Sequence, residues 1–130
     1  MVPTLPPADG ALPAAVLKHL DAPDGTHFDV LLAVRLPTGD DDLVCATWRA
    51  PHDPAELPPG AMLELEPIAP HRARYLRIGA PVDLGNGRGT AVPVRKGTWH
   101  AGPDRSIEFR WDDGGRTRVQ PESMTCWRID

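Results

Sequence analysis

The sequence has few cysteines and no long apolar run. Cys45 and Cys126 are its two cysteines, and they stand far apart in the chain. A disulfide framework or a zinc ribbon needs closely spaced cysteine or Cys/His pairs, so neither is expected. Both thiols are predicted to be reduced, with a disulfide between two central strands as the alternative. A membrane-spanning helix needs about 20 consecutive apolar residues, which excludes a membrane protein.

The first 13 residues hold four prolines and no basic side chain. A secretory signal peptide starts with positive charge and continues with an unbroken apolar stretch, so this segment does not fit one. We expect a cytoplasmic protein. Residues 1–13 are predicted to form an irregular or disordered arm, and residues 14–130 a single domain that is a monomer.

The chain also lacks an excess of positive charge. Its formal net charge is −4 at pH 7, which argues against a protein that coats nucleic acid non-specifically. Residues 71–100 nevertheless hold six basic side chains against one acidic side chain, Asp83. This segment is either a surface for an anionic ligand or a solvated strand face, and charge alone leaves both interpretations open.

Proline and glycine are abundant, with 16 and 12 residues, and they mark frequent turns. Between the turns lie short segments rich in Val, Ile, Leu and Trp, which are typical of strands. These segments are residues 15–20, 27–36, 43–49, 62–68, 74–78, 90–94, 107–111, 116–119 and 124–129. Such spacing is typical of an all-β barrel or sandwich. We predict an all-β fold, a compact single-domain β-barrel with short irregular connections.

Several turns have a specific interpretation. Asp112-Asp113-Gly114-Gly115 separates two apolar segments and predicts a hairpin. A short helical turn is expected at residues 54–57. The glycine-rich residues 85–89 lack the Lys-Ser/Thr of a P-loop, so a strand connection is expected rather than a phosphate loop. The three aspartates of residues 40–42 are expected to form a solvated hairpin tip.

One predicted strand carries a polar pair beside an apolar face. Side chains two apart in a strand point the same way, so His27 and Asp29 share one face while Phe28, Val30 and Leu32 share the other. The apolar face is predicted to lie in the core. The His–Asp pair would then act jointly on a ligand or metal, or would be a surface pair that contributes little stability.

Six short motifs follow one another in a recognisable order. They are Lys18-His19, His27-Phe28-Asp29, Thr47-Trp48-x-x-Pro51, His71-x-x-x-Tyr75, Gly87-x-Gly89-Thr90 and Gly97-Thr98-Trp99. In order and spacing, residues 16–129 resemble the 3′-phosphoesterase domain of bacterial DNA ligase D. The chain is also similar to short stand-alone bacterial proteins related to that domain.

The resemblance implies a compact β-barrel whose groove holds a divalent metal, Mn²⁺ before Zn²⁺. It implies removal of 3′-phosphates or 3′-ribonucleotides from a nucleic-acid end, with a repair ligase or polymerase as partner. A phosphorylated small molecule is the alternative substrate. By the same resemblance the metal ligands are His19, Asp29 and His71. The catalytic residues are His27 and Tyr75.

The chain departs from the family pattern where arginine or lysine is expected to bind phosphate. Leu31 and Leu63 stand in place of two family arginines, and His52 in place of a lysine. Losing an arginine from such a site costs on the order of 10²-fold in rate. We therefore expect weak activity that Leu31→Arg raises.

Other residues are candidates for the missing cations. His52, Arg72 and Arg74 are the predicted substrate-binding residues, and Arg35 and Arg49 are further candidates. The alternative to an enzyme is a catalytically silent, metal-containing module that binds nucleic acid or a repair partner. A non-haem iron site is a third possibility, since two histidines and one carboxylate also form the facial triad of oxygenases. The four tryptophans are expected to pack in the core.

Overall fold

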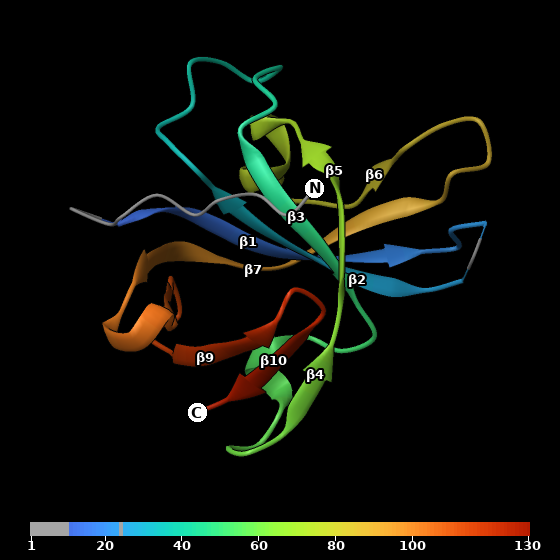
Figure 1. Cartoon of the computed structure of the whole chain (residues 1–130). Helices are drawn as coiled ribbons and strands as arrows, with labels where there is room; N and C mark the ends of the chain where they lie inside the picture. Colours follow the sequence, from blue (N-terminus) through green and yellow to red (C-terminus); the bar gives the residue numbers. More distant parts are fainter. Residues whose placement is uncertain (1–10, 24) are drawn as a thin grey trace.

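The computed structural model describes residues 11–23 and 25–130 (Figure 1). It confirms the all-β class, because the described residues form ten strands and three short 3₁₀ helices. The strands are β1 (Leu12–Leu20), β2 (His27–Ala33), β3 (Cys45–Ala50), β4 (Met62–Glu64), β5 (Glu66–His71), β6 (Val82–Asp83), β7 (Thr90–Ala101), β8 (Ile107–Trp111), β9 (Arg116–Ser123) and β10 (Cys126–Ile129). The helices are η1 (Pro54–Glu56), η2 (Ala73–Leu76) and η3 (Pro103–Arg105). None of these helices is long enough to cross a membrane.

All strands belong to one antiparallel sheet in the order β4-β10-β9-β8-β7-β1-β2-β3-β5, with β6 beside β7. The predicted barrel is wrong, because within residues 11–23 and 25–130 no strand pairing joins the two ends of this order. The end strands β4 and β5 are instead consecutive in the chain, separated by Leu65 alone. A single chain segment thus pairs with β10 through its first half and with β3 through its second half.

The sheet wraps around its main apolar core. Residues from both ends of the strand order meet there, and the rings of Trp48 on β3 and Trp127 on β10 have centroids 5.3 Å apart. All four tryptophans are buried, as the sequence predicted. Val30 and Leu32 of β2 also lie in this core, so we call the face of the sheet that they share the inner face.

The outer face of the sheet is partly covered as well. Leu31 of β2 is fully buried there in a second apolar cluster, which also contains Leu17 of β1 and Ala73 and Leu76 of η2. The predicted polar pair, His27 and Asp29, shares this face, and beyond Asp29 the face is apolar and buried. The reason is that residues 73–84 fold back over β1 and β2 and supply a second apolar layer.

Local predictions had mixed outcomes. The 112–115 hairpin between β8 and β9 and the helical turn at η1 are confirmed. The strand predicted at residues 74–78 is wrong, since η2 lies there. β1 begins at Leu12, inside the predicted arm, and residues 1–10 lie outside the described residues. Both cysteines are free thiols, Cys45 buried and Cys126 half-buried.

Candidate metal and phosphate site

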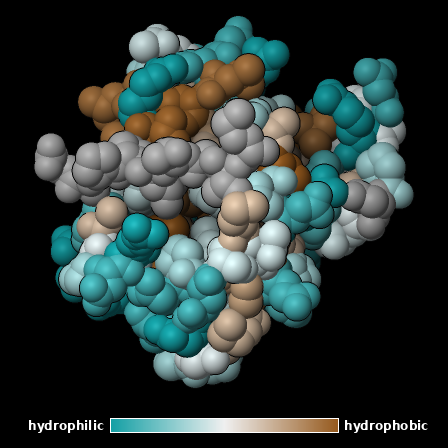
Figure 2. Space-filling model, viewed as in Figure 1, coloured by the Kyte–Doolittle hydropathy of each residue, from teal (hydrophilic) through white to brown (hydrophobic). Residues whose placement is uncertain are grey.

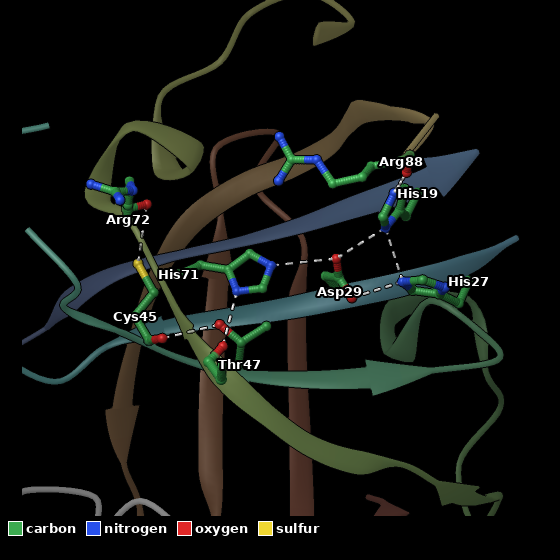
Figure 3. Close-up of polar contacts among 9 residues, drawn as sticks. His19, His27, Asp29, Cys45, Thr47, His71, Arg72 and Arg88 are labelled. Carbon is green, nitrogen blue, oxygen red and sulfur yellow. Dashed lines mark hydrogen bonds and ion pairs between the residues drawn. The ribbon is translucent and has the colours of Figure 1, made fainter. Parts of the chain in front are cut away.

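Strand pairing brings polar side chains together on the outer face of the sheet. His19 of β1 lies opposite His27 of β2, and Asp29 lies opposite Arg49 of β3. Directly paired residues of antiparallel strands point to the same face, and side chains alternate along each strand. His71, the last residue of β5, is paired with Cys45 of β3 and joins the group from the other side (Figure 3).

Three histidines surround the carboxylate of Asp29. Asp29 Oδ2 lies 3.9 Å from His19 Nδ1 and 3.7 Å from His71 Nε2. Asp29 Oδ1 lies 3.2 Å from His27 Nε2, which is itself 3.2 Å from His19 Nδ1. The structure therefore brings the three predicted metal ligands together, and it adds His27 to them.

Backbone carbonyls determine which ring nitrogen carries the proton in His19 and in His71. His19 Nε2 lies 2.6 Å from the carbonyl oxygen of Arg88, and His71 Nδ1 lies 3.1 Å from that of Ala69. A carbonyl only accepts hydrogen bonds, so each of these nitrogens must be the donor. In the neutral rings, His19 Nδ1 and His71 Nε2 then present lone pairs to Asp29.

This arrangement fits a cation. Asp29 is buried, and its Oδ1 atom has no hydrogen-bond partner among the described residues, although His27 Nε2 lies 3.2 Å away. A buried carboxylate oxygen without a hydrogen bond is costly, and imidazole lone pairs directed at a carboxylate repel it. A divalent ion would relieve both costs at once. Neutral imidazole and carboxylate are ligands that suit Mn²⁺ and Zn²⁺.

The tightest group of donors differs from the predicted one. One donor atom each from His19, His27 and Asp29 lie within 4.8 Å of one another. His27, predicted to be catalytic, is thus placed to be a ligand. His71, predicted to be a ligand, faces Asp29 from across the site, and its side chain is 27% exposed, against 8% for that of His27.

A pocket of about 310 Å³ opens beside this group. Its polar lining combines His19, Asp29, His71 and Tyr75 with three arginines, Arg49, Arg72 and Arg88. Tyr75 comes from η2, and its ring centroid lies 6.0 Å from that of His71. The pocket therefore joins a candidate cation site to several positive charges, which is what a phosphate group requires.

The predicted substrate-binding residues lie in different places. Arg72 lines the pocket. Arg74 does not line it and is paired with Asp41. His52 is exposed in the loop after β3 and is not part of the pocket lining. Of the three predicted residues, Arg72 alone is part of this pocket lining, and substrate binding by all three stays a prediction.

The two leucines at positions where the resemblance predicts arginine do not line the pocket. Leu31 is fully buried in the outer apolar cluster and Leu63 in the main core. An arginine at either position would be buried among apolar side chains, which argues against the expectation that Leu31→Arg raises activity.

Arg88, by contrast, was missed by the sequence argument. It lies in the glycine-rich connection that was predicted only to join strands, and its guanidinium lies against the carbonyls of Leu84 and Gly85. No acidic side chain of the described residues pairs with it. Arg49, named only as an alternative, is also part of the lining.

The acidic turn at residues 40–42 is more than a solvated tip. Asp41 pairs with Arg72 at 3.6 Å and also with Arg74, and Asp40 pairs with Arg77 at 3.5 Å. Much of the positive charge of residues 71–100 is therefore neutralised by an acidic segment far away in sequence.

A second pocket, of about 590 Å³, shares Arg49 with the first and is also lined by His27. Glu64 and Glu66 add two carboxylates to its lining. These acids disfavour a phosphate there, so the smaller pocket is the better phosphate site.

No family model, curated protein or solved structure matches this chain.

Proposed function

We propose that the protein is a divalent-metal-dependent phosphoesterase that removes phosphate from nucleic-acid 3′ ends. The observation that carries the proposal is the convergence of three imidazole rings on the buried carboxylate of Asp29, beside a pocket that contains arginines. The resemblance to the ligase D phosphoesterase domain supports the choice of a 3′ end as substrate.

His19, His27 and Asp29 would hold the metal, for which Mn²⁺ is the first choice. When bound, a divalent ion supplies an activated water and neutralises phosphate charge. The carbonyl of Arg88 accepts a hydrogen bond from His19 Nε2–H, and this keeps the lone pair of His19 Nδ1 directed into the site.

The other pocket residues bind phosphate and move protons. Arg49, which is paired with Asp29 in the sheet, and Arg88 both line the pocket and would donate hydrogen bonds to phosphate oxygens. His71 Nε2 faces the same space and is free to accept a proton, while its Nδ1 stays bonded to the carbonyl of Ala69. The Tyr75 hydroxyl is a further donor in the pocket.

The test measures hydrolysis and metal binding separately. Metal-stripped protein is given a 3′-phosphorylated DNA primer with Mn²⁺, Zn²⁺ or a chelator, and metal affinity is measured by calorimetry. We expect Mn²⁺-dependent release of phosphate. Asp29→Asn is expected to lose both metal binding and hydrolysis, whereas His71→Gln keeps the metal and loses about 10²-fold or more in kcat. Asp112→Asn, at an exposed hairpin tip, is the control.

Two results would contradict the proposal. Hydrolysis that persists without metal, or that Asp29→Asn leaves unchanged, would show that the site does not carry out the reaction. Metal bound at this site with no turnover on any phosphorylated end would make the protein a binding module.

A further inference from the structure

A row of three polar side chains, two of them arginines, crosses the sheet away from the metal site. Thr98 of β7 is paired with Arg110 of β8, and Arg110 is paired with Arg116 of β9. Directly paired residues share a face, so these three side chains lie side by side. Trp99 and Phe109, their neighbours in sequence, point into the main core, so the row is on the outer face.

Neither arginine of this row has an acidic partner within residues 11–23 and 25–130. The two acids that border the same hollow, Glu108 and Asp130, are already neutralised by other cations. Glu108 lies 2.6 Å from His100 and 3.7 Å from Arg118, and Asp130 lies 3.2 Å from Arg118. Arg110 and Arg116 are both exposed and border a hollow of about 290 Å³.

This pair of arginines is unfavourable for the fold alone. Like charges directly opposite each other on antiparallel strands repel. Most other arginines of the described residues have an acidic partner, as Arg72, Arg77 and Arg95 do. An anion between the two guanidinium groups would remove the repulsion, and the planar fork of arginine matches the oxygens of a phosphate.

The row shares the outer face with the metal site. Along β1, alternation places Pro13 on the same face as Leu17 and His19, with one bulge between Val16 and Leu17. Pro13 is paired with Thr98, the first residue of the row, and Leu17 with Asp29. An anion that reaches both places must carry negative charge at intervals along its length, as a phosphodiester chain does.

We propose that Arg110 and Arg116 bind the sugar-phosphate backbone of a single-stranded nucleic acid upstream of its 3′ end. The inference deepens the proposed function and rests on it for the position of that end. Recognition is independent of base identity, because the aromatic rings beside the row, Phe109 and Trp111, are buried and offer no stacking surface.

The test measures the binding of fluorescent oligo(dT) with a 3′-hydroxyl, in chelator, by anisotropy at several salt concentrations. The Arg110→Gln/Arg116→Gln double variant is expected to bind at least about 10-fold more weakly at low salt. Its salt slope should fall by about 1.4, since each lost phosphate contact on a single strand removes about 0.7. An abasic oligonucleotide should bind as tightly as oligo(dT).

Arg128→Gln is the matched control, because Arg128 is also exposed but pairs with Glu122 and Asp130. An unchanged affinity and salt slope in the double variant, or an equal loss in the control, would overturn the inference. Hydrolysis of p-nitrophenyl phosphate with Mn²⁺ tests the proposed function separately. Arg110 and Arg116 are not part of the metal-site pocket, so the double variant should hydrolyse this small ester at the wild-type rate.

Discussion

His19 donates through Nε2 to the backbone carbonyl of Arg88, at 2.6 Å, although 69 residues separate the two. This bond leaves the Nδ1 lone pair of His19 directed toward Asp29 and His27. A loop with no ligand of its own thus prepares a ligand on β1. Loss of a hydrogen bond that orients a metal-binding histidine typically lowers metal affinity by about 10- to 100-fold.

Gly89 holds this loop in place. Gly89 has a φ of +92°, and a Cβ atom at this position would lie 2.1 Å from the carbonyl oxygen of Leu20. We expect Gly89→Ala to displace the Arg88 carbonyl and to weaken Mn²⁺ binding by about 10-fold or more, as measured by calorimetry. Gly87→Ala is the control, with φ +70° and open space around its Cβ. It should lose only about 1 kcal/mol of stability, and equal losses of metal affinity in both variants would contradict the loop's role.

Leu31→Arg should destabilise the protein rather than improve its activity. Leu31 is fully buried, and a lone guanidinium there costs about 3–5 kcal/mol. Urea denaturation should show this loss, whereas Leu31→Met should cost less than about 1.5 kcal/mol. A Leu31→Arg variant with wild-type stability and faster phosphate release would mean that the side chain reaches the pocket.

The ion pair between Asp53 and Arg95 should be important for stability. The Asp53 side chain is 2% exposed and accepts a hydrogen bond from Arg95 Nε at 2.9 Å. It also caps η1 by accepting a hydrogen bond from the N–H of Ala55. Asp53→Asn leaves Arg95 without its buried counter-charge, which we expect to cost about 3 kcal/mol in urea denaturation. Glu56→Gln, whose side chain is 73% exposed, should cost less than about 1 kcal/mol. Similar costs for the two substitutions would argue against a special role for burial.

Acid should weaken the loop that carries Asp42. Hydrogen bonds from Arg35 and Thr38 lower the pKa of Asp42 well below its usual range. The unfolded chain therefore takes up this proton first as pH falls, so the stabilisation is present above about pH 4 and is lost at lower pH. In urea denaturation, the difference in midpoint between wild type and Asp42→Asn should shrink from pH 6 to pH 2. A constant difference would contradict the assignment.

Asp42 also connects this loop to the pocket. Its backbone carbonyl accepts a hydrogen bond from the N–H of Ala73. Ala73 is the first residue of η2, the helix that carries Tyr75. Loosening of the loop in acid should therefore disturb η2 as well, which can be followed by hydrogen exchange at the Ala73 amide.

Local pattern was enough to predict several features. Alternation along β2 correctly separated Asp29 from Val30 and Leu32, because a strand has a side-chain period of two whatever surrounds it. The 112–115 hairpin was likewise predictable, since glycine and aspartate favour the turn by their own backbone preferences. The apolar character of the strands was enough to place the four tryptophans in the core.

Only the tertiary structure decided how the site is completed. Arg49 stands opposite Asp29 because of the pairing register between β2 and β3, and the carbonyl of Arg88 meets His19 because the loop before β7 folds back on β1. The burial of Leu31 depends in the same way on residues 73–84 covering the outer face. These features arise from contacts between segments distant in sequence, and no periodicity within either segment encodes them.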